Sequence, residues 1–301
     1  MEIPRVLTIA GSDSGGGAGI QADLKTITVL GGFGMSVITA LTAQNTLGVH
    51  GIHEVPPDFV EAQFNAVAGD IGIDAAKIGM LSSIGIMQVV ARKVREYRVD
   101  RLVLDPVMVA KGGSALIRPE AVQCLIDDLV PLALLITPNL PEAEVLSGVS
   151  IGSSKDIREA ASIIHRLGAR NVLIKGGHGQ GDAADILFDG REFHEFVSPR
   201  IDTRDTHGTG CTFSAAIATG LALGLDIREA VHKAKEYITT AIRFSLRLGK
   251  GHGPTNHAAF LFRENGCCRC IQAFVGKDSA VHVPGGSPGY GVDVSPLLGQ
   301  K

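Results

Sequence analysis

Apolar and polar residues alternate along residues 1–262 in short blocks of two kinds. Runs of apolar residues that end in glycine or polar residues predict buried strands at 6–10, 35–46, 75–80, 101–108, 132–139 and 171–179. Between them, apolar residues recur at helical spacing over 20–30, 56–70, 83–97, 119–131 and 153–168. This alternation with brief loops predicts one α/β domain, with a mainly parallel sheet covered by helices on both faces.

The later part of the chain adds a different pattern. The stretch 184–199 predicts a β-hairpin with Asp189 and Gly190 at its turn. The small-residue apolar stretch 212–225 predicts a buried helix, and 227–248 predicts an amphipathic one. The helix at 212–225 therefore belongs at the centre of the domain.

A tight turn precedes that central helix, formed by Gly208, Thr209, Gly210 and Cys211. Glycine lets the backbone fold closely and bring its N–H groups near a ligand. The helix that follows directs unpaired N–H groups and its positive dipole end to the same place, which suits a phosphate. A thiol in that field loses its proton more readily, so Cys211 is a candidate base. The alternative is a simple strand-to-helix turn with a small core cysteine.

Other polar residues follow the predicted strands. The glycine-rich loop 11–19 follows the first strand, and Gln44 ends the second. Asp105 follows a later strand, and open α/β sheets bind ligands at this edge. The remaining candidates there are a possible phosphate contact, Lys175, and a possible cation-binding pair, Asn139 and Glu142. A glutamate at a helix start is also stabilised simply by the helix dipole.

Composition narrows the class of protein. The formal net charge of −3 gives no electrostatic case for binding nucleic acid or an anionic membrane. No apolar run reaches the length of a membrane span, and no leader-like segment begins the chain, so we expect a cytoplasmic location. The stretch 110–117 is a candidate lid. From residue 263 to 301 the periodicity disappears, which predicts a disordered tail.

Six sequence blocks resemble a known family when they are taken in order. They are GSDSGGGAGIQADLKT (11–26), ALTAQNT (40–46), DPVM (105–108), TPNLPEAE (137–144), KGGH (175–178) and THGTGCT (206–212). Together they resemble the hydroxymethylpyrimidine and phosphomethylpyrimidine kinases of thiamine biosynthesis, within the ribokinase-like superfamily. The resemblance implies a ribokinase-like αβα sandwich over residues 1–262, a pyrimidine substrate, ATP, Mg²⁺ and a homodimer.

The resemblance also implies roles for particular residues. Gln44 would read the edge of the pyrimidine, with a ring site of Gly11, Asp23, Met80, Val107 and Met108. ATP and its phosphates would contact Asp105, Asn139, Lys175 and Thr209, and Mg²⁺ would bind Asp105, Asn139 and Glu142. The catalytic turn would be Gly208, Thr209, Gly210 and Cys211, with Cys211 in the place of the aspartate base of related sugar kinases.

Three other functions are compatible with parts of this pattern. A pyridoxal or pyridoxine kinase can carry the same cysteine-containing turn, although Gln44 and Met80 favour an aminopyrimidine. A catalytically silent pyrimidine-binding protein would not need Lys175, the Asn139–Glu142 pair and the turn together. A dinucleotide-dependent oxidoreductase would need a characteristic glycine motif and an acidic ribose-binding residue, and the sequence has neither at the expected spacing.

Overall fold

The structure is a computed structural model that describes residues 3–109, 119–176 and 181–263. The strands of its main sheet are β1 (Arg5–Ala10), β2 (Phe33–Ile38), β5 (Ala75–Ile78), β6 (Leu102–Leu104), β7 (Leu135–Ile136), β8 (Val172–Ile174), β9 (Ala183–Phe188) and β10 (Phe193–Ser198). They are ordered β10-β9-β8-β7-β6-β5-β1-β2, and the pairs β8–β9 and β9–β10 are antiparallel, whereas the other pairs are parallel. The predicted mainly parallel sheet is confirmed.

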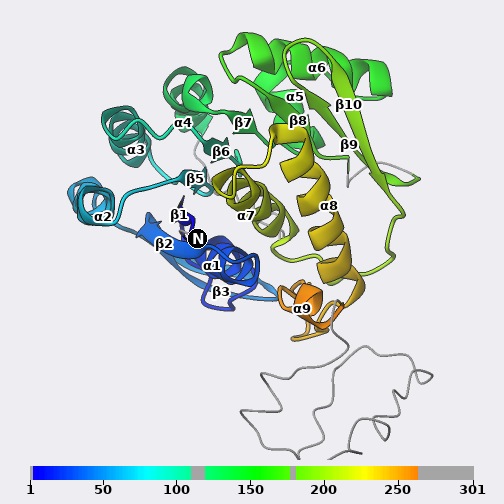
Figure 1. The fold of residues 1–301 in the computed structure, drawn as a ribbon, viewed down its shortest axis with the longest axis horizontal. Helices are drawn as coiled ribbons and strands as arrows, with labels where there is room; N and C mark the ends of the chain where they lie inside the picture. The colour runs from blue at the N-terminus through cyan, green and yellow to red at the C-terminus, as the bar shows by residue number, and fades with distance from the viewer. Residues whose placement is uncertain (1–2, 110–118, 177–180, 264–301) are drawn as a thin grey trace, which may run out of the picture.

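Helices cover both faces of this sheet (Figure 1). They are α1 (Gly19–Val29), α2 (Pro57–Asp70), α3 (Ile84–Glu96), α4 (Pro119–Cys124), α5 (Leu140–Ser147), α6 (Ser154–Arg166), α7 (Thr209–Ala222), α8 (Ile227–Arg243) and α9 (Ala259–Arg263). A π-helical turn (Leu125–Leu129) and a 3₁₀ turn (Val130–Leu132) continue α4 to the predicted end of its helix near residue 131. The arrangement is the predicted αβα sandwich.

Two hydrophobic cores follow from the alternation of side chains along the strands. Leu7 of β1 packs into the core with α2 and α3, whereas its neighbour Val6 packs into the core with α1, α7 and α8. Helix α7 lies at the centre of the second core, and every residue from 212 to 221 is buried. Its small side chains let α1 and α8 pack closely on either side of it.

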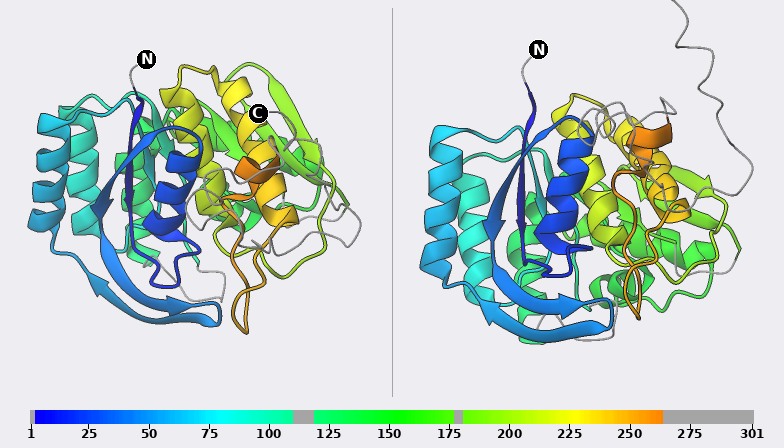
Figure 2. Two further views of the ribbon diagram at one scale, coloured as in Figure 1. Left: turned by 60° about the horizontal axis from the view of Figure 1, so that its bottom comes forward. Right: turned by 90° about the horizontal axis from the view of Figure 1, so that it is seen from below.

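The predicted strand 35–46 is wrong as a single strand. The chain leaves the main sheet after Ile38, whose backbone N–H and C=O both bond to the amide of Gln63 on α2. It then forms β3 (Ala40–Asn45), which pairs antiparallel with β4 (Gly48–Glu54) in a separate two-stranded sheet. The amide of Gln63 thus satisfies the backbone groups of Ile38 that face the open edge of the sheet, where β2 has no further neighbouring strand. Figure 2 shows this hairpin extending away from the sheet.

The remaining boundaries agree in place but differ in length. Strands β6, β7 and β8 are shorter than their apolar runs, and the run that holds β7 begins with the 3₁₀ turn. The hairpin β9–β10 turns at Asp189 and Gly190 as predicted, with Gly190 at a φ of 90°. The lid candidate 110–117 and the tail from residue 264 lie outside the described residues. Within the described part, no helix is long and apolar enough to cross a membrane.

Candidate active site

The anion turn, residues 208–211, lies where the carboxyl ends of the central strands meet. Gly208 is the N-cap of α7 and has a φ of 78°, which favours glycine. A Cβ at Gly208 would also overlap the carbonyl oxygen of Gly17 in the glycine-rich loop. A Cβ at Gly210 would lie 3.5 Å from both Asp105 Oδ2 and Lys175 Nζ. The start of α7 therefore faces a charged pair, as the sequence predicted.

Lys175 and Asp105 form the ion pair at the centre of this site. Lys175 Nζ lies 2.7 Å from Asp105 Oδ1, and both residues sit just past the ends of their strands, β8 and β6. Thr137 and Ser214 also donate hydrogen bonds to the Asp105 carboxylate, at 3.2 Å each. Burial opposes ionisation of Asp105, but Lys175 and Lys77 outweigh it, and its pKa is lowered. The carboxylate therefore holds the Lys175 ammonium in place beside the anion turn.

Asn139 and Glu142 form a capping box at the start of α5. The Asn139 side chain accepts from the Glu142 N–H at 2.9 Å, and Glu142 Oε2 accepts from the Asn139 N–H at 2.8 Å. Burial raises the pKa of Glu142 to about 7, Lys175 opposes this rise, and Asp105 adds to it. The cap occupies one acceptor of each side chain, so Glu142 has further acceptor capacity for a cation. The helix-start role and a cation-binding role are thus compatible.

Cys211 differs from the prediction in its ionisation. The residue lies in the first turn of α7, and its thiol has its pKa raised to about 11. The main cause is burial, which outweighs the opposing effect of the Lys77 ammonium, and nearby Asp23 and Asp105 raise the value further. The expected easily ionised thiol is therefore wrong for the structure as it stands, because desolvation exceeds the effect of the helix end.

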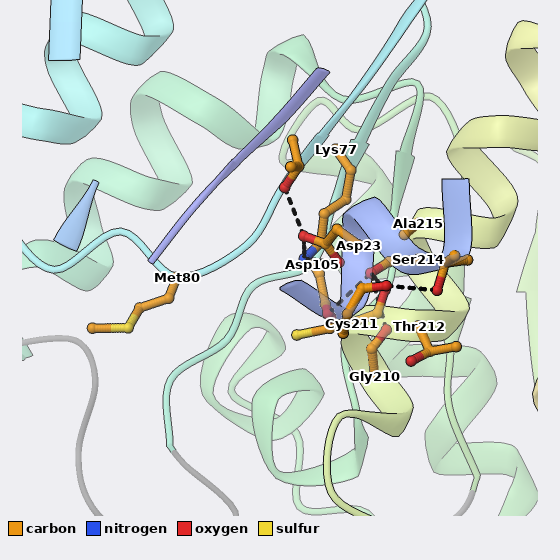
Figure 3. A network of polar contacts seen from close by, with 12 residues as sticks. Asp23, Lys77, Met80, Asp105, Gly210, Cys211, Thr212, Ser214 and Ala215 are labelled. Carbon is orange, nitrogen blue, oxygen red and sulfur yellow. Dashed lines mark hydrogen bonds and ion pairs between the residues drawn. The ribbon is translucent and has the colours of Figure 1, made fainter. Parts of the chain in front are cut away.

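Asp23 was predicted to lie beside the pyrimidine ring, and the structure corrects this. Its side chain is fully buried and forms an ion pair with Lys77 Nζ at 2.8 Å, and it accepts a 2.6 Å hydrogen bond from Thr8. A group with no exposed surface is not part of a pocket wall. The buried pair lies beneath the site, with Asp105 and Cys211 near it (Figure 3). Sequence reasoning missed Lys77, because a lysine inside an apolar strand gives no outward signal.

The other candidate ring contacts, Gly11, Met80, Val107, Met108 and Gln44, differ in how much surface they expose. A Cβ at Gly11 would lie 3.2 Å from Met80 Sδ, so these two residues are neighbours. Val107 is partly exposed, and its N–H bonds to the Asp105 carbonyl at 2.8 Å. Met108 is 6% exposed and packs within the hydrophobic core, so its side chain offers little surface to a ring. Gln44 is partly buried on β3, opposite the glycine-rich loop.

A buried pair, Asp13 and His207, joins the glycine-rich loop to the anion turn. His207 Nε2 lies 2.8 Å from Asp13 Oδ2. The same carboxylate accepts from the backbone N–H groups of Gly15, Gly17 and Ala18 at 2.8–3.0 Å. Sequence reasoning missed both residues. The available signal was an aspartate at the start of a glycine run, where its side chain can accept N–H bonds from its own loop.

Comparison with known proteins identifies a family for this chain. The family profile described as phosphomethylpyrimidine kinase matches residues 13–256. The hydroxymethylpyrimidine/phosphomethylpyrimidine kinase of Bacillus subtilis is 51% identical over 262 residues, which cover 86% of this chain and 97% of that protein. The thiamine biosynthesis bifunctional protein of Geobacter sulfurreducens is 62% identical over 253 residues. These cover 84% of this chain but 52% of that protein, so the chain spans about half the length of this relative.

Solved structures agree with the fold. The phosphomethylpyrimidine kinase of Clostridium difficile 630 matches with a TM-score of 0.72 and 47% identity, over 80% of this chain and all of that one. An ADP complex of Bacillus subtilis pyridoxal kinase matches with a TM-score of 0.81 and 42% identity, over 87% of this chain and all of that one. Fold and site define a phosphotransferase of the ribokinase-like class. The chain belongs to the phosphomethylpyrimidine kinase family.

Proposed function

We propose that this chain transfers the γ-phosphoryl group of ATP to the hydroxymethyl group of 4-amino-5-hydroxymethyl-2-methylpyrimidine, and then phosphorylates the resulting monophosphate, in thiamine biosynthesis. The observation that carries the proposal is the anion turn facing the Lys175–Asp105 pair. It occurs in a chain about half identical to kinases named for these two substrates. The ADP complex of the Bacillus subtilis pyridoxal kinase supports a nucleotide at this site.

The residues of the anion turn and Lys175 neutralise charge during transfer. Phosphoryl transfer depends mainly on positioning and on stabilising the charge of the transferred oxygens. The N–H groups at the start of α7 donate hydrogen bonds that stabilise the negative charge of these oxygens, and the Lys175 ammonium stabilises it further. Asp105 fixes the ammonium, and Ser214 and Thr137 fix Asp105. The groups are thus oriented before the nucleotide binds.

The same acidic residues fit a magnesium ion. Mg²⁺ is usually held by one or two carboxylates and by substrate phosphates. Asp105 and Glu142 are two buried carboxylates near the Lys175 ammonium, and the negative charge of Asp105 opposes the ionisation of Glu142. A divalent cation would favour the ionised form of Glu142, and Asn139 would orient that side chain through the capping box. When bound, the ion would neutralise charge on the phosphates.

Cys211 acts in this scheme as a neutral thiol at the first turn of α7. With a pKa of about 11, the thiol is protonated at neutral pH. It is then suited to orient the substrate hydroxyl by a weak hydrogen bond rather than to remove its proton. The competing account, a thiolate base, would affect the first phosphorylation more, because the monophosphate acceptor of the second needs little deprotonation.

A second candidate function is phosphorylation of pyridoxal. The observation that favours it is the similarity to the pyridoxal kinase of Bacillus subtilis, at 42% identity and a TM-score of 0.81. The anion turn and Lys175 would serve either hydroxymethyl acceptor. Discrimination between the two substrates therefore rests on the ring-binding end of the site.

We also propose that two copies of the chain associate. The support is the exposed apolar residues of the β3–β4 hairpin: Leu41, Leu47 and Ile52 are 48%, 61% and 43% exposed, with Leu41 and Ile52 on opposite faces of the hairpin. Sedimentation analysis of the wild-type protein and of a Leu41→Lys, Ile52→Lys variant tests this. A monomeric wild-type protein at micromolar concentration would contradict it.

The function is tested by ADP release with Mg-ATP, comparing the hydroxymethylpyrimidine, its monophosphate and pyridoxal. We expect turnover of both pyrimidines and slower turnover of pyridoxal. Faster turnover of pyridoxal would support the second candidate. Binding of the pyrimidine without turnover of any substrate would instead indicate a catalytically silent binding protein.

A further inference from the structure

The Gln44 amide lies beside a residue with no assigned role, Thr42. On β3 the side chains of Ala40, Thr42 and Gln44 alternate with exposed neighbours and so share one face. That face lies against the glycine-rich loop and Met80, since Gly11 approaches both Ala40 and Met80. Thr42 is 8% exposed, so its hydroxyl group is buried between the hairpin and the loop.

The backbone of this part of β3 is fixed by two serines of the glycine-rich loop. Ser14 Oγ donates to the Gln44 carbonyl at 2.7 Å and accepts from the Gln44 N–H at 2.8 Å. Ser12 Oγ accepts from the Thr42 N–H at 3.2 Å. The position of Gln44 along the strand is thus set from both sides of its peptide unit. The terminal amide of Gln44 can take two orientations at this place, related by a half-turn that exchanges its oxygen and nitrogen.

The hydroxyl proton of Thr42 decides that half-turn. Thr42 Oγ1 lies 2.9 Å from the Ser12 carbonyl oxygen and 3.2 Å from Gln44 Oε1. A carbonyl oxygen can only accept, and a hydroxyl has a single proton to donate. With Oε1 toward Thr42, two acceptors share that proton. A half-turn of the amide lets Gln44 Nε2 donate to the Thr42 oxygen, while the Thr42 proton goes wholly to the Ser12 carbonyl.

We propose that Thr42 is a specificity-determining positioning residue, which holds the Gln44 amide with its NH₂ group inward and its carbonyl oxygen toward the substrate. An outward oxygen accepts a hydrogen bond and so selects a ring that carries a donor. The exocyclic amino group of an aminopyrimidine is such a donor. Pyridoxal has no ring amino group, and its ring hydroxyl is ionised at neutral pH and acts as an acceptor. This inference rests on the proposed kinase function.

The test compares Thr42→Val, Thr42→Ser and wild type by kcat/KM on hydroxymethylpyrimidine and on pyridoxal. Valine has nearly the shape of threonine but can neither donate nor accept, so the Gln44 amide becomes free to turn. We expect the ratio of the two kcat/KM values to fall by roughly 10-fold in the valine variant, the scale of one hydrogen bond. The serine variant, which keeps the hydroxyl group, restores the ratio. The control is Thr219→Val, which changes a different buried threonine, on α7. We expect it to leave the ratio at its wild-type value.

Each outcome separates the inference from the function beneath it. A valine variant that loses activity equally on both substrates, with a lower melting temperature, would show a merely structural role for Thr42 and overturn the inference. A ratio that moves toward the pyrimidine would show the opposite orientation of the amide and also overturn it. If wild type itself turns over no pyrimidine, the proposed function fails instead. Wild-type turnover with an unchanged variant ratio defeats only the role of Thr42.

Discussion

At the proposed phosphate end of the site, Lys175, Asp105 and Glu142 are ionisable groups that influence one another's ionisation. At the proposed ring-binding end, Ser12, Thr42 and Gln44 are neutral and are joined by hydroxyl and amide hydrogen bonds. The first arrangement stabilises charge strongly in a poorly hydrated place. The second distinguishes donors from acceptors, because each neutral group has few hydrogen-bonding choices.

The difference between the charged and the neutral end is consistent with the similarity of this chain to kinases that act on pyridoxal. Phosphoryl transfer presents the same charges whichever hydroxymethyl ring accepts the group. The pyridoxal kinase of Staphylococcus aureus, solved with a nucleotide analogue and pyridoxal, shares the fold at 36% identity and a TM-score of 0.80. We infer that the charged end defines the reaction and the neutral end defines the substrate.

The largest effect is expected at the charged end. Lys175→Met removes the ammonium that Asp105 holds beside the anion turn. We expect kcat to fall by about 10²–10³-fold on both the pyrimidine and pyridoxal, as for loss of one preorganised charge-stabilising donor. Steady-state kinetics measure this, with Lys93→Met on α3, an ion-paired lysine away from the site, as the control. A loss confined to one substrate would contradict the division between the two ends.

A backbone substitution tests how rigid the charged end is. Gly208→Ala places a Cβ at a φ of 78° and against the carbonyl oxygen of Gly17. We expect the free energy of unfolding to fall by about 1–3 kcal/mol for the strained backbone, with a further loss from the overlap and a loss of kcat.

Gly148→Ala is the matched control for that change. Gly148 has a φ of 72°, but a Cβ there meets nothing within 4 Å. Chemical denaturation of both variants therefore separates backbone strain from the overlap. Equal destabilisation of the two would show that the contact with Gly17 contributes nothing.

An intermediate effect is expected at Cys211, where the reactivity of the thiol should depend on pH. A pKa raised to about 11 leaves little thiolate near pH 7, and the thiolate fraction rises as pH approaches 11. We expect alkylation of Cys211 by iodoacetamide, followed by peptide mass spectrometry, to be slow at pH 7 and to accelerate up to about pH 11. Half-maximal reactivity below pH 8 would instead support the account in which Cys211 acts as a thiolate base.

The kinetics of Cys211→Ser give an independent check on the same residue. General bases usually contribute 10²–10⁴-fold, so a neutral positioning group is expected to cost less than roughly 10²-fold in kcat. The loss should be similar for the hydroxymethylpyrimidine and its monophosphate. A selective loss on the first substrate would favour the base instead.

The smallest effect is expected at the neutral end. A Cβ at Gly11 would lie 3.2 Å from Met80 Sδ, the far part of a flexible side chain. Gly11→Ala therefore displaces Met80 by a few tenths of an ångström, and we expect a change of only a few-fold in the KM of the pyrimidine, with kcat preserved. Steady-state kinetics over a range of pyrimidine concentrations measure both constants. A loss of kcat as large as that of Gly208→Ala would show that the neutral end is equally rigid.

The sheet was predictable from the sequence wherever apolar runs end in polar residues. Asp105, Asn139 and Lys175 each follow a strand, and the parallel sheet brings them to one edge. The turn to the β3–β4 hairpin was not predictable, because it falls inside a run that reads as one strand, and the bonds to Ile38 at that point come from Gln63 of α2. Local patterns do not report such tertiary contacts.

The same limit applies to ionisation within the site. The sequence identified Cys211 and Asp23 as site residues but not the burial that raises the pKa of the Cys211 thiol and pairs Asp23 with Lys77. Desolvation depends on the groups that pack around a residue, and those come from β1, β5 and α1. Motif spacing predicts which chemical groups assemble, and three-dimensional packing decides their charge.

The bond between Asp13 and His207 has a consequence for how the enzyme is made. The two residues are 194 positions apart, and the His207 backbone is bonded in turn to Gly253 and Thr255. Pairing over such a separation carries a high cost of loop closure and forms late in folding. During synthesis, the glycine-rich loop emerges from the ribosome long before its partner exists. The glycine-rich loop and the anion turn can therefore be joined only after residues 207–255 have been synthesised.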